Sequence, residues 1–420
     1  MAETCCLPAS DATPAGCAVA RNPDPGRLQG QAWRDFCGLS GGIALVGLAL
    51  GSLLPLSALR LEQGGHGSAV VGLLMAVHAL GLMLALAVTA PVLRWVGARE
   101  VLITASAAAA GLAMALQAAH GPAWLAAGLF GLGLLLGLVF NLVETWVNAL
   151  LPEAARGRWL AVHCTVFTLF QLCGPALLPL LPAPSAYLIC GGLLLLALPM
   201  YRLLSARDLA DSAEADDPEA GRPEAESADW PWWRLVAQSP ATVWSTVLFA
   251  LFDALVLSLL PLYARAQGQG ESEALLSASV VLAGDTALEW AVGALADRHG
   301  RRRLQWVCAL LLLAVAPLLP LAVGSWAWWP LLALMGGAAG GLYVLSLMAS
   351  GQRYSGRGLL RITAVLGAAW GAASAVGPLL TGVAMAFSPI WALPVVLCSC
   401  TAVLLVALRL ERPLTSLTSL

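Results

Sequence analysis

The chain has 420 residues, of which 59% are hydrophobic and only 11% are charged, with a formal net charge of −2. A soluble domain usually has about a quarter of its residues charged, so this composition excludes a soluble protein of this length. The ten cysteines match neither a zinc-site spacing nor a disulfide framework. We therefore expect an all-α integral membrane protein.

Runs of mostly apolar residues follow one another along the chain, each long enough to cross a bilayer core of about 30 Å, which takes about 20 residues. The first six expected helices are 36–60, 68–93, 100–119, 122–149, 158–181 and 184–204. The next six are 238–263, 274–296, 303–323, 325–349, 360–386 and 388–408. Trp33 and Phe36 are predicted to anchor the chain at the membrane interface before the first helix.

A segment of different composition, 205–237, separates the two groups of six. It is rich in Asp and Glu and contains Pro218 and Pro223, which is typical of a solvated linker. Trp230, Trp232 and Trp233 near its end read as a second interfacial anchor. The sequence thus predicts an N-terminal tail 1–35, a bundle 36–204, the linker 205–237, a bundle 238–408 and a C-terminal tail 409–420.

The arginines indicate the orientation of the chain in the membrane. All 22 basic residues are arginine, and if the N-terminus is cytoplasmic, only Arg60 and Arg265 fall on the outer side. Because cytoplasmic loops carry an excess of basic residues, this distribution predicts that both termini and the linker are cytoplasmic. An odd number of membrane crossings would destroy the alternation, so the pattern also supports twelve.

The loop between the eighth and ninth expected helices has a recognisable motif. It reads Gly293-Ala-Leu-Ala-Asp297-Arg298-His299-Gly300-Arg301-Arg302 and resembles the cytoplasmic-loop signature of the major facilitator superfamily (MFS). The resemblance implies two pseudo-repeated six-helix bundles, with this loop bracing the inner gate. The equivalent loop of the first half keeps Gly97 and Arg99 but has Arg94 in the place of Asp297, so the same acid–base pairing is not expected there.

Other segments resemble the YcaD-like branch of that superfamily. They are Asn141-Leu-Val-Glu144-Thr-Trp-Val-Asn148 with Pro152, then Arg156-Gly-Arg158, Gly174-Pro175 and Leu260-Pro261-Leu262-Tyr263. Gly377-Pro378 repeats Gly174-Pro175, as expected of duplicated halves. The substrates of that branch are poorly defined, so the resemblance names no cargo.

Acidic residues inside the second group of helices need a reason, because an ionisable group at the bilayer centre costs about 2.5–3.5 kcal/mol on insertion scales. Asp285 and Glu289 lie one helical turn apart and share a face. Two carboxylates so close in a low dielectric do not both ionise easily, which favours a proton carrier; a structural bond to a neighbouring helix is an equal alternative. Asp253 lies on the seventh helix, which lines the cavity in the superfamily, so we expect a substrate or proton role.

In the first half, Glu144 forms a polar stripe with Asn141 and Asn148 toward the cytoplasmic side. We favour a role of Glu144 in the inner gate over substrate contact. The residues expected at this gate are Glu144, Asn148, Arg94, Arg156 and Arg158.

One face of the fifth helix gathers polar and aromatic side chains: His163, Phe167, Phe170, Gln171 and Gly174. This face would either line a pocket for an aromatic or amphipathic cargo or pack against the eighth helix. His78, three residues after Met75, suggests copper, but two ligands are too few, and a histidine bonded within the bundle is favoured. The candidates for proton coupling or the substrate cavity are Asp253, Asp285, Glu289, His78, His163 and Gln171.

The sequence contains no nucleotide-binding loop and no soluble catalytic constellation, so we expect neither an enzyme nor a bound metal or other cofactor. We expect a monomeric secondary transporter of a bacterial cytoplasmic membrane that moves a small organic molecule with protons and binds no nucleic acid. Export of an amphipathic or lipophilic compound is favoured by the apolar composition and the few charges expected in the cavity. Uptake of a neutral or cationic metabolite, and a non-transport scaffold or sensor on the same fold, are the alternatives.

Overall fold

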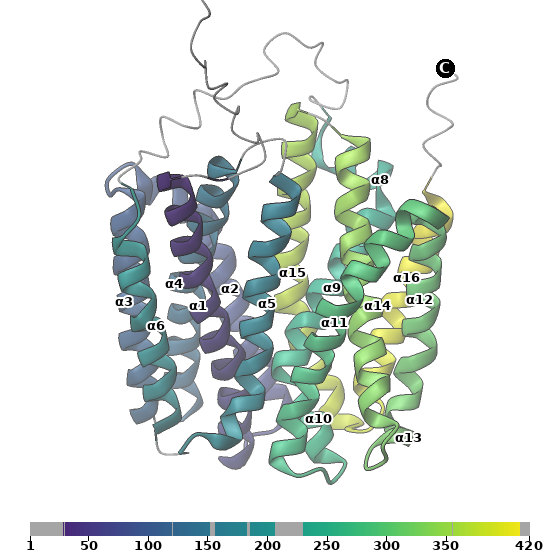
Figure 1. The fold of residues 1–420 in the computed structure, drawn as a ribbon. Coiled ribbons are helices and arrows are strands. Elements are labelled where there is room, and N and C mark those ends of the chain that lie inside the picture. The colour runs from purple at the N-terminus through teal and green to yellow at the C-terminus, as the bar shows by residue number, and fades with distance from the viewer. Residues whose placement is uncertain are drawn as a thin grey trace, which may run out of the picture.

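The structure is a computed structural model whose described residues are all helical or in turns and loops (Figure 1). These residues are 28, 30–119, 121–151, 156–182, 185–205, 230–354 and 356–411. Most of both predicted tails and of the predicted acidic linker, with Pro152, lies outside the described residues.

The helices follow the predicted order. The first group contains α1 Gly30–Gln63, α2 Ser68–Leu93, α3 Ala98–Ala115 with η1 Leu116–Ala118, α4 Pro122–Leu150, α5 Arg156–Leu177 with η3 Leu178–Leu180, and α6 Ala186–Arg202. The second contains α8 Trp232–Gln238, α9 Pro240–Ser258, α10 Leu260–Ala266, α11 Glu271–His299, α12 Arg301–Val315, η6 Ala316–Leu318, α13 Leu319–Ala322, α14 Trp328–Arg353, α15 Gly356–Phe387 and α16 Ala392–Leu410.

Eleven helices of the described chain are long and apolar enough to cross a membrane, and α6, with 17 residues, is a shorter apolar helix. Three expectations about element boundaries were wrong. The end of the predicted linker 205–237 is a short helix, α8, which begins at Trp232. The first helix begins at Gly30, so Trp33 and Phe36 lie inside it rather than before it. The seventh expected helix is broken into α9 and α10 at Leu259, just before Pro261, which has no backbone N–H to continue the hydrogen-bond ladder.

The helices pack in two groups that we call the first half (α1 to α6) and the second half (α8 to α16). Within the first half, α1 packs on α5 and α6, and α2 on α4; within the second, α11 packs on α14, and α9 on α15 and α16. The halves meet mainly through two helix pairs, α2 with α15 and α5 with α11. Glycine permits the closest approach, since a Cβ on Gly72 of α2 would stand 2.2 Å from the Pro378 carbonyl oxygen of α15.

We call the end of the bundle where α1 begins and α16 ends the terminal end, and the opposite end the distal end (Figure 1). Hydrogen bonds between described residues of the two halves gather toward the distal end. The pairs are Arg265 Nε with Glu62 Oε2 (2.8 Å), Gln63 Nε2 with Glu271 Oε2 (3.3 Å), Ser68 Oγ with the Gly382 carbonyl (2.9 Å) and Ser279 Oγ with the Leu172 carbonyl (2.6 Å). The halves are therefore held together at this end.

Arg60 and Arg265, the two arginines predicted to lie on the outer side of the membrane, both have partners at the distal end. Arg60 donates to the carbonyls of Leu116 and Ala119 at 2.6 and 2.9 Å, and its guanidinium lies over the Tyr187 ring. Arg265 pairs with Glu62 across the halves. Local bonding thus explains their positions.

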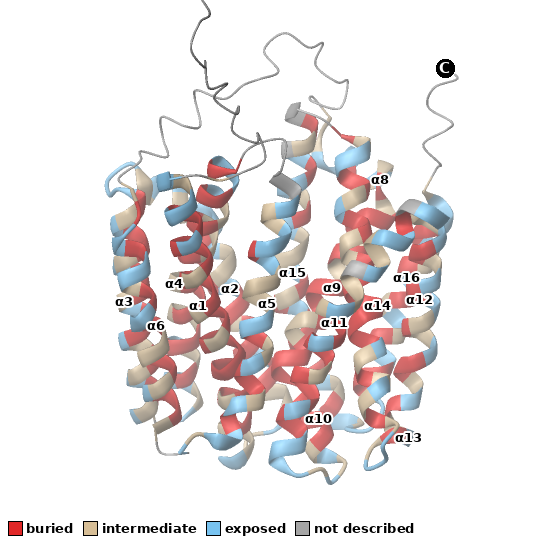
Figure 2. Cartoon of the chain, in the orientation of Figure 1, coloured by how far each residue is buried: buried red, intermediate tan, exposed pale blue. Residues whose placement is uncertain are grey.

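The outer surface of the bundle carries large apolar side chains, as contact with lipid requires. Leu80 and Leu84 of α2, Leu196 of α6, Val307 of α12 and Val406 of α16 are among the exposed ones. Buried residues instead follow the helices through the interior of the bundle (Figure 2).

Candidate functional site

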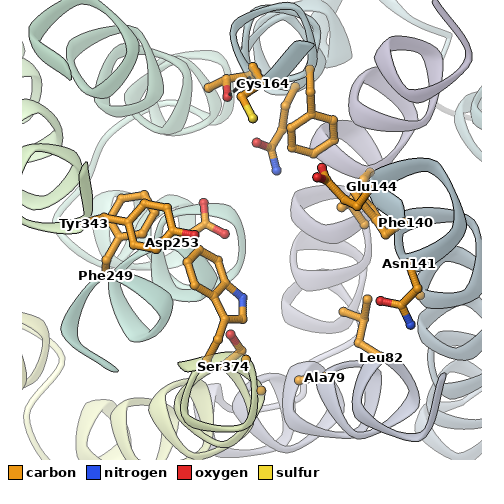
Figure 3. A pocket seen from close by; sticks show the side chains of 18 of the residues that line it. Ala79, Leu82, Phe140, Asn141, Glu144, Cys164, Phe249, Asp253, Tyr343 and Ser374 are labelled. Atoms are coloured by element: carbon orange, nitrogen blue, oxygen red, sulfur yellow. Dashed lines mark hydrogen bonds between the residues drawn. The ribbon is translucent and has the colours of Figure 1, made fainter. Parts of the chain in front are cut away.

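A cavity of about 460 Å³ lies between the two halves, near the middle of the bundle (Figure 3). Four helices of each half line it: α1, α2, α4 and α5 from the first, and α9, α11, α14 and α15 from the second. A cavity at the interface of two repeated bundles is where secondary transporters bind their substrates.

Four carboxylates of the described residues line the cavity, more charge than the composition led us to expect. Asp253 comes from α9, Asp285 and Glu289 from α11, and Glu144 from α4. Asp253 and Glu144 lie on opposite sides, each with its carboxylate toward the open centre (Figure 3). Among the described lining residues there is no arginine or histidine, so the cavity has a strongly acidic character.

Asp285 is the most deeply placed of these acids. Its side chain is only 6% exposed, and its Oδ1 has no hydrogen-bond partner in the described part of the chain. The carboxylate fits because α14 has a glycine opposite it: a Cβ on Gly340 would stand 1.5 Å from Oδ1. A buried polar atom without a partner is costly. Because this oxygen packs against α14, the cost would be relieved by protonation of the carboxylate or by a positive charge at the part of the side chain that lines the cavity.

Three aromatic rings form a cluster beside Asp253, to which we refer as the aromatic cluster: Phe249, Tyr343 and Trp370. The Phe249 and Tyr343 rings stack at 4.8 Å between centroids, and Trp370 meets them edge-on at 5.5 and 5.1 Å. All three line the cavity. Phe249 and Asp253 share a face of α9 because they are four residues apart, so charge and rings are presented together.

The first and second halves each form one wall of the cavity, and lining residues of the two walls correspond at a constant offset in residue number. Leu50, Leu82 and Leu86 of the first half lie 203 residues before Asp253, Asp285 and Glu289, and all six line the cavity. The same offset relates Phe140 and Phe167, which pack edge-on at 5.1 Å, to Tyr343 and Trp370. The second half therefore has three acids where the first has three leucines, while both keep an aromatic pair.

The exposure of the lining residues shows where the cavity opens. Leu50 and Gln171 are buried, whereas Glu144, nearer the terminal end, is 46% exposed and Cys164 on α5 is exposed. Together with the contacts that join the halves at the distal end, this gradient shows a cavity open toward the terminal end.

His163 does not line the cavity but lies directly behind Glu144. Its Nδ1 is hydrogen-bonded to Ser40 Oγ at 2.8 Å, and its Nε2 is 3.7 Å from Glu144 Oε1. The ring is buried, so it can orient Glu144 without itself meeting a substrate. On the same face of α5, Phe167 and Gln171 line the cavity, whereas Gly174 packs on Gly51 of α1.

His78 was predicted as a cavity candidate, and the structure places it elsewhere. Its Nδ1 is 3.0 Å from the Leu129 carbonyl, and Gly133 of α4 packs against its backbone, so the ring is fixed between α2 and α4. In the described part of the chain, no group of three or more His, Cys, Asp or Glu side chains is placed to hold a metal ion.

The residues predicted at the inner gate lie at the terminal end. Arg94 follows α2 and is exposed; Arg158 is exposed with its guanidinium over the Trp159 ring, and Asn148 donates to the Glu144 carbonyl at 2.9 Å. Within the described part of the chain, Glu144 makes an ion contact with His163. The side chain of Arg156 is outside the described residues.

The loop motif between α11 and α12 ties these helices to their neighbours. Gly300 has φ +85°, a conformation that glycine adopts at no steric cost, and it permits the tight turn. Arg301 donates to Gln352 of α14, and Arg302 to the Leu408 carbonyl of α16 at 2.8 Å. Gly293 lies within α11, Arg298 is exposed at its end, and the side chain of Asp297 is outside the described residues.

Sequence reasoning missed the aromatic cluster and Cys164. The spacing of Phe249 to Asp253 was a usable signal, because four residues place both on one helix face. Tyr343 and Trp370 gave no such signal, since membrane helices carry aromatic residues on every face. The 203-residue offset could have been read from Gly174-Pro175 and Gly377-Pro378, which it also relates.

Comparisons with known proteins are consistent with this architecture. The family model of the Major Facilitator Superfamily matches residues 39–287 and 245–419. A mutant of the nucleoside transporter NupG superimposes with a TM-score of 0.71 at 11% identity, covering 90% of this chain and 98% of that one. A bacterial homologue of the human lysosomal transporter Spinster, inward-facing and unoccupied, gives 0.70 at 16% identity, covering 91% and 97%. No curated protein matches the sequence.

The chain therefore belongs to the major facilitator superfamily, as the loop motif predicted, and is a transporter rather than an enzyme. At these identities the solved structures establish the fold alone. The YcaD-like branch remains a prediction from the sequence.

Proposed function

We propose that this protein is a secondary active transporter that carries a small organic molecule across the bacterial cytoplasmic membrane by alternating access. The observation that carries the proposal is the acidic cavity between the halves, open toward the terminal end and bounded by cross-half contacts at the distal end. Rocking of the halves about such a cavity would expose it to each side of the membrane in turn.

The proposed placement in the membrane has twelve crossings. The twelfth crossing would be α6, a shorter apolar helix of 17 residues that packs along α3 and α1. The arginine distribution supports a cytoplasmic terminal end, with both tails and the linker on that side. The proposed units are then the bundles 36–204 and 238–408, with α1 extended to Gly30.

We propose that protons are the coupling ion and that Asp253, Asp285 and Glu289 carry them. Three carboxylates in one partly closed cavity repel one another when ionised, so protonation is favoured when no other cation is present. The other titratable groups that line the cavity in the described chain are Glu144 of α4, Cys164 of α5 and Tyr343 of α14. A bound cargo would change the proton occupancy of these groups and so link its movement to the proton gradient.

The gate at the terminal end is proposed to close through Glu144, Asn148, Arg94, Arg156 and Arg158. In the present conformation Arg94 and Arg158 are exposed and Glu144 faces the cavity. All three belong to the first half, so closure would pair these opposite charges through movement of α2, α4 and α5 relative to one another. The loop around Gly300 would move with α11 and α12 as one unit, since Arg301 and Arg302 tie that turn to α14 and α16.

Export is the proposed direction, because the cavity is lined mainly by apolar side chains, which suits an amphipathic or lipophilic compound. Uptake of a neutral or cationic metabolite is the alternative. A scaffold or sensor would need neither a cavity of this size nor buried acids within it.

The test uses full-length protein in proteoliposomes with an imposed pH gradient and a screen of neutral, anionic and cationic organic compounds. We expect at least one compound to move with the gradient, and Asp253→Asn, Asp285→Asn and Glu289→Gln each to uncouple or abolish that movement. Glu273→Gln, an exposed acid in the first turn of α11 and outside the cavity, is the matched control. Proton-linked movement unaffected by all three substitutions would refute the coupling, and no movement of any compound would favour the scaffold.

A further inference from the structure

We propose that the substrate is an amphipathic organic cation, bound with its charge against Asp253 and Asp285 and the aromatic cluster, and its apolar part against the leucines of the first half. This inference rests on the proposed transport function and adds to it the chemical class and the orientation of the cargo.

The charge of the cavity favours a cationic cargo. The described residues that line the cavity include four carboxylates and no arginine or histidine. When these acids are ionised, an anionic cargo would meet only repulsion, and a neutral cargo would leave their charges uncompensated. A cation compensates them directly.

Asp285 supplies a deeply placed negative charge at the cavity. Its side chain is more than nine-tenths buried and lines the cavity. Its Oδ1 packs against Gly340 of α14 and has no hydrogen-bond partner among the described residues. Because a buried charge without a partner is costly, a cation at the part of this side chain that lines the cavity would stabilise it.

The aromatic cluster lies beside the acids and also favours an organic cation. An organic cation over an aromatic face is attracted by the ring quadrupole, most strongly when water is excluded. Phe249 is buried, and its ring, with those of Tyr343 and Trp370, lines the cavity next to Asp253. Rings and carboxylate together suit a cation whose charge is embedded in carbon rather than a small hydrated ion.

The two halves also differ in the side chains that they place at corresponding positions of the cavity. Leu50, Leu82 and Leu86 occupy the positions in the first half that Asp253, Asp285 and Glu289 occupy in the second. A molecule with a cationic end and an apolar end matches this division. The cavity of about 460 Å³ lies within the range of about 300–1,000 Å³ that is usual for small-molecule sites.

The experiment compares two ions of the same shape and opposite charge. Binding of radiolabelled tetraphenylphosphonium and of tetraphenylborate is measured on immobilised full-length protein in detergent, with protein-free detergent as the blank. We expect the cation to bind and the anion not to, and we expect Asp253→Asn and Asp285→Asn each to weaken cation binding about tenfold or more.

The variants separate the contribution of the rings from that of the charge. Tyr343→Ala is expected to weaken cation binding by several-fold, up to about tenfold, whereas Tyr343→Phe keeps the ring and should retain it. Glu273→Gln removes an acid outside the cavity on the same helix as Asp285 and serves as the charge-matched control. Size-exclusion chromatography and thermal melting show whether each variant is folded.

The proposal is overturned if the wild-type protein binds both ions equally or binds only the borate, since either result shows that lipophilicity and not positive charge is recognised. It is also overturned if the cation binds but Asp253→Asn and Asp285→Asn, both folded, leave its affinity unchanged. If a variant misfolds, the comparison of cation and anion binding to the wild-type protein still tests whether positive charge is recognised. Movement of a neutral or anionic compound with the pH gradient, without cation binding, would refute this inference and leave the proposed transport function standing.

Discussion

The two halves of this protein share a scaffold but differ in the chemistry that they bring to the cavity. Gly133 and Gly137 of α4 pack on α2 as Gly336 and Gly340 of α14 pack on α11, with the same offset of 203 residues. Where Gly137 faces Leu82 and Ala85, Gly340 faces the Asp285 carboxylate. A duplicated backbone thus preserves close helix packing, while a few side chains give the second half three acids at the cavity and leave the first half with leucines at those positions and Glu144 elsewhere.

The largest effect on transport is expected when an acid of the second half is replaced by the leucine that the first half has at the corresponding position. Asp253→Leu introduces the residue that its counterpart Leu50 already has and removes a carboxylate from the centre of the cavity. We expect the rate of pH-gradient-driven transport in proteoliposomes to fall about a hundredfold, equivalent to about 2.7 kcal/mol. Glu273→Gln should retain the wild-type rate; a retained rate in Asp253→Leu would mean that the walls are functionally equivalent.

The packing of the second half can be tested at Gly340. Gly340→Ala places a methyl group where the Asp285 carboxylate lies, and overpacking of this kind costs roughly 1–3 kcal/mol, so the melting temperature in detergent should fall. Because the clash is with the side chain and not with the backbone, adding Asp285→Ala should recover most of the loss.

Two further glycine variants serve as controls for the comparison of Gly340→Ala with the double variant Gly340→Ala/Asp285→Ala. Gly293→Ala, on the same pair of helices but with open space around the new Cβ, should leave the melting temperature nearly unchanged. Gly336→Ala would meet the Val281 carbonyl at 2.0 Å, a backbone contact that no side-chain deletion relieves. If Gly340→Ala lowers the melting temperature equally in the wild-type background and in the Asp285→Ala background, Gly340 does not serve to make room for the Asp285 carboxylate.

A smaller effect is expected for the acid of the first half. Glu144 is 46% exposed, so water already solvates its charge and its removal should cost less than removal of Asp253. Glu144→Gln is expected to lower the transport rate only about threefold, under about 1 kcal/mol. A loss as large as that of Asp253→Asn would show that both walls carry the coupling.

The smallest effect is expected where the halves touch at the distal end. Arg265→Ala removes a partly exposed ion pair with Glu62, worth about 0.2–1 kcal/mol, and should shift the balance away from the conformation open at the terminal end. Cys164 lines the cavity and is exposed, so alkylation of a variant with Cys164 as its only cysteine reports this opening. We expect the alkylation rate to fall less than about fivefold in Arg265→Ala, and less again in Arg265→Lys. An increase would mean that the pair favours the opposite state.

Much of the fold was predictable because membrane helices need a minimum apolar length. Eleven of the expected runs are helices of spanning length in the described chain, and α6, with 17 residues, is a shorter apolar helix. The break at Leu259 and the start of α1 at Gly30 were missed, because an apolar run shows that a helix exists more clearly than where it bends or begins.

The sequence by itself determined that this is a duplicated bundle of membrane helices with acids inside the membrane at Asp253, Asp285 and Glu289. It could do so because the free-energy cost of exposing an apolar side chain to water, or of burying a charge, depends on the residue type at each position. It could not determine which way each helix is turned, since every face of a membrane helix is apolar and lipid and protein neighbours look alike in sequence. Only the tertiary structure decided that these acids share one cavity with three aromatic rings, that three leucines form the facing wall, and that His78 and His163 lie behind the wall. Those outcomes depend on helix rotation and on close approach at glycines such as Gly340, which are set by packing between segments far apart in the chain.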